Sequence, residues 1–201
     1  MRHRFAAIAA MLAAFWSLSL GATADEAEHS TMPLSAPIIL APGVEMQLPD
    51  LTSLNRHIEV VQSVVASYGS QSIAIEGRID AGPDHFTMVC SDGLGRRAVT
   101  VQWTSSGVSY ETAPWVPKQL RPQNMLADLV MIYWPQDALT KAMPDATITT
   151  TPTSRSIAIG GKDIANVDYA PQAGDVWFGK TTYHDPLWHY TLSIESAALE
   201  P

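Results

Sequence analysis

The feature that most constrains the fold of this chain is a series of short strand-type runs. Residues 58–67 are rich in valine, and in residues 71–80 the side chains of Ile73, Ile75 and Ile79 alternate with polar ones. Comparable runs occupy residues 85–90, 98–103, 108–112, 147–151, 155–159, 164–169, 176–182 and 189–195. Glycine-containing turns such as Tyr68-Gly69-Ser70 and Gly160-Gly161 separate them. The pattern predicts a mainly β (α+β) protein with about ten antiparallel strands in sequence order.

The periodicity changes once, in the middle of the chain. Residues 123–134 lack alternation and favour a helix, with Pro122 near its first turn and Pro135 ending it. Residues 136–142 predict a second short helix at an angle to the first, behind that proline. Asp128 is the single charged residue of the first helix, so we expect this helix to be buried on more than one side.

A long antiparallel sheet tends to curl, and its inner face needs a cover. The apolar helical segment is the expected cover, and two alternatives are open: it plugs a closed core, or it lines a cavity that accepts an apolar ligand. Flexible thioethers and aromatic rings suit an irregular ligand and an ordinary core equally well. In and around the helical segment these residues are Trp115, Met125, Met131, Tyr133, Trp134 and Met143.

The N-terminus has the pattern of an export signal. Arg2 and Arg4 precede an apolar run over residues 5–20, and a small-residue site ends at Ala24. The run is short for a bilayer core, which needs about 20 apolar residues. We therefore predict a signal peptide at 1–24 that is cleaved after Ala24, and a location in the periplasm.

The rest of the chain divides into an arm and one domain. Residues 25–56 predict a proline-rich linker or loosely docked arm, and residues 57–201 a single β-rich domain. The chain is long enough, and at 46% hydrophobic residues apolar enough, for one sizeable core. The prolines of the arm are Pro33, Pro37, Pro42 and Pro49.

Charge and cysteine usage exclude several classes of protein. Of the 12 basic residues, Arg2 and Arg4 leave with the signal, so 10 remain against 20 acidic ones and the formal charge is −10. This balance argues against binding nucleic acid or anionic lipid surfaces electrostatically. Cys90 is the only cysteine and lies in an apolar run, which predicts a buried thiol and neither a disulfide nor a lipid-modified N-terminal cysteine.

The sequence offers little support for catalysis. His184 and His189 flank Asp185 closely enough to suggest a metal site, but five residues along a strand place the two rings on opposite faces. Ser105 and Ser106 lie at a hairpin tip without an identifiable base, and the common hydrolase, zinc-protease, phosphate-loop and dinucleotide motifs are absent. We therefore predict no catalytic residues, no metal ligands, no cofactor and no enzyme activity.

Three segments of the chain resemble a bacterial protein family. They are Leu94-Gly95-Arg96-Arg97, the stretch Met125-Leu126-Ala127-Asp128-Leu129 followed by Tyr133-Trp134-Pro135 and Leu139, and the ending Tyr190-Thr191-Leu192-Ser193-Ile194-Glu195. Taken together over residues 57–196, they resemble the domain of unknown function 3261, a family of uncharacterised outer-membrane-associated lipoproteins.

The resemblance implies a fold like that of the periplasmic lipoprotein carriers LolA and LolB, a curved, incomplete antiparallel barrel covered by helices. Members are often encoded beside enzymes and exporters for aryl polyene lipids, which implies that the family carries an acylated product toward the outer membrane. This chain lacks the family's lipid-anchor cysteine, so the expected form is a soluble shuttle that contacts that membrane transiently.

From these observations we expect a non-catalytic carrier for an acyl or polyene lipid, or for a lipoprotein acyl chain. The alternative is an assembly module that binds an envelope biosynthesis or export protein. Asp128 is expected to cap or pair locally, and Arg96 and Arg97 to shape a turn surface. The residues expected to line an apolar pocket are Met88, Trp103, Leu126, Leu129, Val130, Tyr133 and Trp134.

Overall fold

The structure is a computed structural model that describes residues 27–118 and 120–199. The predicted signal peptide at 1–24 lies outside the described residues. Within the described ranges, no helix has the length and apolar character that crossing a bilayer requires.

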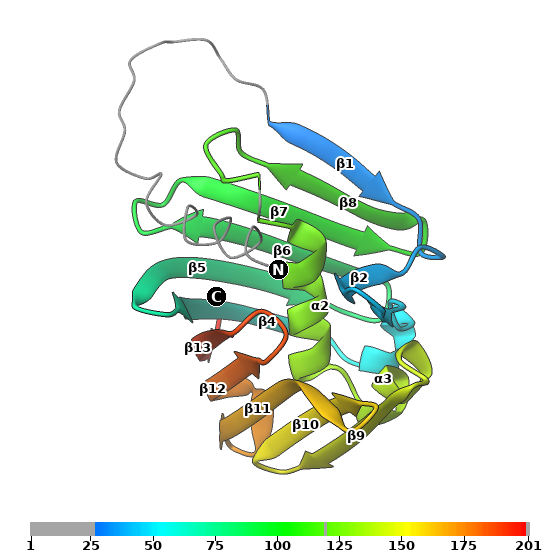
Figure 1. Cartoon of the computed structure of the whole chain (residues 1–201). Coiled ribbons are helices and arrows are strands. Elements are labelled where there is room, and N and C mark those ends of the chain that lie inside the picture. The colour runs from blue at the N-terminus through cyan, green and yellow to red at the C-terminus, as the bar shows by residue number, and fades with distance from the viewer. Residues whose placement is uncertain (1–26, 119, 200–201) are drawn as a thin grey trace.

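Most of the described chain forms one open antiparallel sheet of eleven strands (Figure 1). Its order is β1-β8-β7-β6-β5-β4-β13-β12-β11-β10-β9, so β1 and β9 are the two edges. The sheet consists of two consecutive meanders, joined where β13 pairs with β4. The strands are β1 Glu28–Met32, β4 Ile58–Tyr68, β5 Gln71–Ala81, β6 His85–Asp92, β7 Arg97–Thr104, β8 Gly107–Thr112, β9 Ala146–Thr151, β10 Ser154–Ile159, β11 Lys162–Gln172, β12 Asp175–Asp185 and β13 Tyr190–Ala198.

All ten predicted strand runs are present, each within a few residues of its expected bounds. The Gly160-Gly161 hairpin is confirmed: both glycines have positive φ angles, 57° and 76°, which a tight turn between β10 and β11 requires. A mainly β protein with antiparallel neighbours is therefore confirmed.

Two helices interrupt the strands, as predicted. Helix α2 spans Pro122–Tyr133 and helix α3 spans Gln136–Ala142, with Trp134 and Pro135 between them. Helix α2 contacts one strand from each meander of the sheet, β7 and β12, and the sheet curls around it (Figure 1). The eight residues from Leu126 to Tyr133 are all buried, which confirms that the helix is buried on more than one side.

Residues 25–56 were expected to form a linker or loosely docked arm, but their described part forms strands and a short helix that pack on the domain. Strand β1 extends the sheet by pairing with β8, and β2 (Ile38–Ala41) and β3 (Val44–Met46) form a separate ribbon that contacts α2. A short 3-10 helix, η2 (Leu51–Leu54), follows. The core includes Ile38, Leu40, Met46, Leu51 and Leu54. Residues 28–54 are thus part of the folded domain; strands of three to five residues between prolines are too short to show a clear period.

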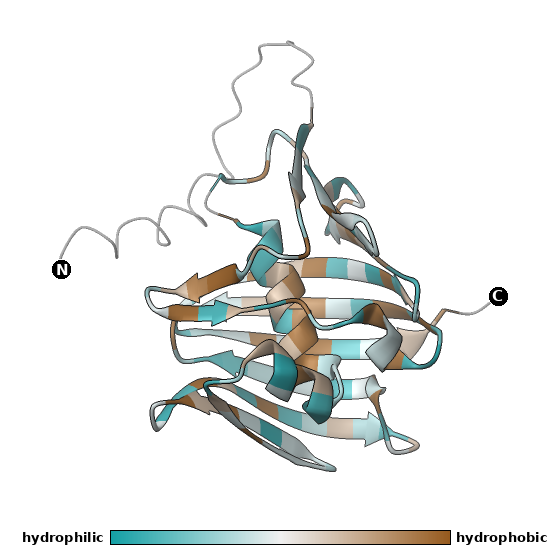
Figure 2. Ribbon diagram, turned by 90° about the vertical axis from the view of Figure 1, so that its right-hand side faces the viewer, coloured by the Kyte–Doolittle hydropathy of each residue, from teal (hydrophilic) through white to brown (hydrophobic). Residues whose placement is uncertain are grey.

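The core lies between α2 and the inner face of the sheet. Figure 2 shows apolar residues along the helix and on the strand segments around it. Cys90 belongs to this core, where burial raises the pKa of its thiol to about 12. At neutral pH this thiol stays protonated, as expected for a buried structural cysteine.

Candidate functional site

The structure brings together all seven residues that were expected to line an apolar pocket. Each is less than a tenth exposed, and all belong to one contiguous core. They come from two strands and the helix: Met88 from β6, Trp103 from β7, and Leu126, Leu129, Val130, Tyr133 and Trp134 from α2 and its end.

Aromatic rings fill the space under the end of α2. Trp134 stacks on Trp103 with ring centroids 5.4 Å apart, and it meets Trp177 of β12 at 6.2 Å. Tyr133 stacks on Trp177 with ring centroids 4.3 Å apart. Trp177 was not singled out in the sequence because it comes from a strand about 40 residues from the helix. This part of the core is closed by ring-to-ring contact.

Two open hollows of the described surface lie elsewhere. The larger of the two, of about 560 Å³, is lined by residues of β1, β6, β7 and β8, and the smaller is lined by Ala27, Arg97 and neighbouring residues. None of the seven expected pocket residues lines either hollow.

The inner face of the sheet is only partly covered where β4, β5 and β13 approach the β4–β5 turn. Five apolar side chains there are half-buried: Val64 and Ala66 on β4, Ile73 and Ile75 on β5, and Leu192 on β13. They lie on the inner face because side chains alternate along each strand and the register is regular. Val64 pairs with Ile75, while Ala66 lies between Ile73 and Leu192. We call these five residues the inner apolar strip.

A buried carboxylate lies beside this strip. Asp128 of α2 accepts hydrogen bonds from the hydroxyls of Tyr183, at 3.0 Å, and Tyr190, at 2.5 Å. Burial is the main cause that raises the pKa of Asp128 to about 7; the nearby Asp185 carboxylate also raises it, and the hydrogen bonds from Tyr190 and Tyr183 act in the lowering direction. Asp128 was expected to cap or pair locally; it pairs instead with two strand residues that are 55 and 62 positions away in the sequence.

The buried guanidinium of Arg155 lies at the C-terminal end of α2 and donates hydrogen bonds to its last turn. Pro135 has no N–H, and the carbonyls of the last helical turn need other donors. Arg155 of β10 donates to the carbonyl oxygens of Met131 and Ile132, at 2.8 and 3.1 Å, and Tyr169 of β11 donates to that of Ile132. A cation at this position also interacts favourably with the negative end of the helix dipole.

The profile of one protein family matches residues 59–198 of this chain, under the description "Protein of unknown function (DUF3261)". That span covers more than half of the sequence. The chain belongs to the DUF3261 family. No curated protein matches it.

In this DUF3261 chain, two of the three segments that carried the resemblance meet in space. The hydrogen bond from Tyr190 to Asp128 joins the final strand to the helix. Arg96 shapes the β6–β7 turn as expected: its guanidinium donates twice to the Asp92 carboxylate, at 2.7 and 2.8 Å, and lies 4.5 Å from the Trp115 ring centroid. These segments therefore support the fold through long-range packing as well as turn geometry.

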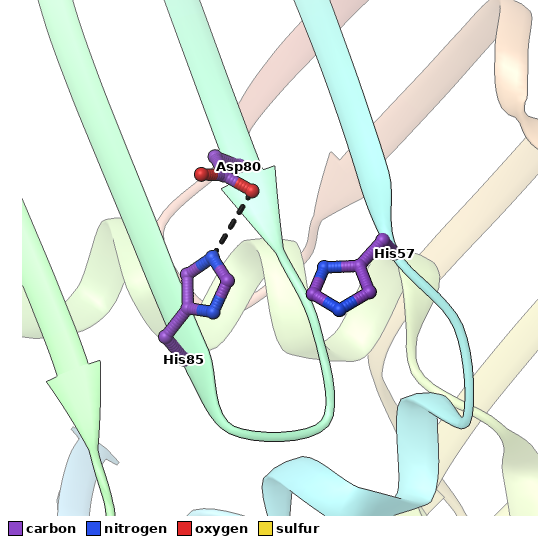
Figure 3. Close-up of side chains that lie close together, drawn as sticks. All are labelled: His57, Asp80 and His85. Atoms are coloured by element: carbon purple, nitrogen blue, oxygen red, sulfur yellow. Dashed lines mark ion pairs between the residues drawn. The ribbon is translucent and has the colours of Figure 1, made fainter.

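Among the described residues, His184 and His189 do not form a group with the spacing of metal ligands. His184 lies on β12 with its ring 3.2 Å from the Thr191 hydroxyl, whereas His189 occupies the turn before β13 with a positive φ of 59°. A different group gathers on the outer face of the sheet: His57, Asp80 and His85 (Figure 3). No sequence pattern indicated this group, because its members come from three separate segments.

Proposed function

We propose that this protein is a periplasmic carrier that holds the acyl or polyene chain of a lipid against the inner apolar strip and moves it toward the outer membrane. The observation that carries the proposal is the half-exposed state of the strip on the concave face of an open sheet. Along β4, β5 and β13, which are all described, none of the inner-facing positions holds a charged residue.

Apolar burial supplies the binding energy. Each methylene that leaves water contributes about 0.8 kcal/mol, so an acyl chain laid over the strip gains several kcal/mol without any polar contact. This assignment places the cargo on the strip rather than among the seven buried residues under α2, where aromatic rings already occupy the space. The expected similarity to the LolA/LolB carriers supports the same role, since those proteins also use a curved sheet with helices on its inner face.

Cargo exchange requires the helix or a neighbouring loop to move. The C-terminal end of α2 is held by Arg155 and Tyr169, and Trp134 is fully buried. The residues of the first turn, from Pro122 to Met125, are only half-buried. We therefore place the mobile end at the start of α2, and not at the break between Trp134 and Pro135, where a hinge would otherwise be expected.

Replacing Ile73 by Asp is expected to weaken the binding of an apolar fluorescent probe at least tenfold. A carboxylate on the strip has to lose its water when an alkyl chain covers it, which opposes binding. Ile73 is half-exposed, so the folded state should tolerate the change. The measurement is a probe titration, together with a thermal melt to show that the variant is folded.

Val65→Asp is the matched control. Val65 lies on the outer face of the same hairpin and is 39% exposed. The substitution adds the same charge eight residues from Ile73 in the chain, but outside the strip. The Val65→Asp variant should therefore bind the probe as tightly as the parent. Equal loss in both variants, or equal affinity in both, would contradict the strip as the binding surface. Loss of probe binding in Ile73→Asp alone would support the strip, and native mass spectrometry of the protein purified under mild conditions would identify the bound lipid.

The second candidate function, an assembly module, is favoured by the free edge at β9. This strand pairs only with β10 in the described chain, and most of its residues are exposed. An unpaired edge can accept a strand from a partner protein. A protein that takes up neither lipid nor probe, but binds an envelope protein through this edge, would replace the carrier proposal.

A further inference from the structure

A second group of polar side chains lies on the face of the sheet opposite to α2. His57 immediately precedes β4, Asp80 is near the end of β5, and His85 begins β6. These three strands are neighbours in the sheet, so their ends place the three side chains together. Figure 3 shows the two imidazoles and the carboxylate pointing toward one another. The buried neighbours Ile79, Ala81 and Phe86 point to the other face, toward the core.

The ligand atoms are close to the spacing that a metal ion requires. One nitrogen from each histidine and one Asp80 oxygen all lie within 4.8 Å of one another. His85 Nε2 is 3.1 Å from Asp80 Oδ1. In a tetrahedral zinc site with bonds of about 2.0–2.1 Å, neighbouring ligand atoms are about 3.3 Å apart. Two of the three ligands thus already have the correct separation, and only His57 has to move closer.

Asp84, the residue just before His85, orients the His85 ring. Its Nδ1 lies 2.8 Å from a carboxylate oxygen of Asp84, which can only accept, so Nδ1 carries the proton and donates. The other ring nitrogen, Nε2, faces Asp80 Oδ1, which is also an acceptor, so without a metal Nε2 donates as well and a zinc ion has to displace that proton. A carboxylate that holds the distal nitrogen of a histidine in this way is the usual outer partner of a zinc-binding imidazole, because it fixes the ring and raises its basicity.

The turn between β5 and β6 leaves room for His57. A Cβ atom added at Gly82 would lie 2.7 Å from two atoms of the His57 ring. Glycine at this position therefore lets the imidazole lie directly against the turn. The turn itself is closed by a hydrogen bond from Gly82 N to His85 O at 2.8 Å and contains Pro83, so it is a rigid platform.

From this geometry we propose that His57, Asp80 and His85 bind one zinc ion, with water completing a tetrahedral site. Two imidazoles and one carboxylate suit zinc, whereas magnesium and calcium favour sites built from oxygen ligands. Asp84 is a positioning residue that holds His85. The site is independent of the inner apolar strip, since it lies on the other face of the sheet and needs no lipid.

The test is zinc binding by the full-length mature protein after treatment with a chelator. Zinc chloride alone is titrated against a chromophoric chelator, and thermal melts are recorded with and without zinc, because an ion that binds only the folded state raises Tm. We expect one zinc ion per chain and a rise in Tm. His57→Ala, Asp80→Asn and His85→Ala should each weaken zinc binding at least tenfold and remove the rise in Tm. Gly82→Ala, which displaces the His57 ring, should weaken binding while keeping all three ligands.

His184→Ala is the matched control, because it removes a histidine exposed on another part of the sheet. It should keep both the stoichiometry and the affinity. The three ligand side chains are exposed or half-exposed, so their variants are expected to fold, and circular dichroism would verify this. No stoichiometric zinc binding by the unaltered protein, or equal binding by the cluster variants and His184→Ala, would overturn the proposal.

Discussion

Replacing Arg155 by Met is expected to lower the free energy of unfolding by about 3 kcal/mol, through the loss of three charge-assisted hydrogen bonds, two of them to buried carbonyls of α2 and one to the Thr150 hydroxyl. Arg155 is 6% exposed and donates to the carbonyl oxygens of Met131 and Ile132. Met fills much of the same space but donates nothing, so the Met131 carbonyl keeps no donor from the sheet. Tyr169 still donates to Ile132, which limits the loss.

Burial also lowers the pKa of Arg155, which reflects the cost of removing this cation from water. Within the described residues no carboxylate forms an ion pair with it, so the end of α2 is its main electrostatic partner. Chemical denaturation measures the change directly. In a thermal melt, about 3 kcal/mol corresponds to a fall in Tm of roughly 6–12 °C for a chain of this size.

Arg78→Met is the control for Arg155→Met. Arg78 is an exposed residue of β5 whose ion pair with Glu76 is 3.4 Å long, and exposed pairs of this kind contribute little. We expect this variant to stay within about 0.5 kcal/mol of the parent. Similar effects of the two substitutions would show that Arg155 does not hold the end of the helix.

Stability is also expected to fall as the pH rises from about 4 to 7, and Asp128→Asn should remove much of that fall. The folded-state pKa of Asp128 is raised to about 7 by burial, whereas an unfolded aspartate ionises near 3.9. Below about pH 4 the carboxyl is protonated in both states, and its contribution to stability is fully present. Between the two pKa values only the unfolded state loses the proton, so the free energy of unfolding falls as the pH rises. The fall reaches about 4 kcal/mol at most, and above pH 7 the contribution of Asp128 no longer changes with pH.

The measurement is the free energy of unfolding of parent and variant across pH 4–8. Asn keeps the shape of the side chain, and the hydroxyls of Tyr183 and Tyr190 can each donate or accept. The difference between the two proteins isolates Asp128 from other titrating groups, including Asp185, whose pKa burial also raises. Asp137→Asn, an exposed change at the start of α3, serves as the control and should follow the parent. Parallel curves for the parent and Asp128→Asn would contradict a buried, protonated Asp128.

These two residues hold α2 on the sheet at different points. Asp128 ties the helix to β12 and β13, and Arg155 with Tyr169 ties its last turn to β10 and β11. All four of these strands belong to the C-terminal meander. The first turn of α2 remains half-buried, and this end is therefore the part of the cover that can yield to a ligand on the inner apolar strip.

Much of the fold could be predicted from local sequence. Strands such as β4 and β5 carry ten or so residues with clear alternation, and Pro122 and Pro135 mark the ends of α2. Such signals depend on residues near one another in the chain, where backbone sterics and side-chain period act directly. The short strands β1, β2 and β3 were not predicted, because each gains its stability mainly from a neighbour: β8 for β1, and α2 with the core for the ribbon.

The sequence by itself determined the ten strands from β4 to β13, their turns, the two helices and the apolar character of α2, because each follows from local period, proline and glycine. It also carried the motifs that identify the family. Only the tertiary structure decided that β13 pairs with β4, that Tyr190 reaches Asp128, and that His57, Asp80 and His85 meet on one face. These contacts join residues up to 138 positions apart, such as Val60 and Ala198, and no local period encodes such a distance. They form because the open sheet curls around α2 and removes one large apolar surface from water.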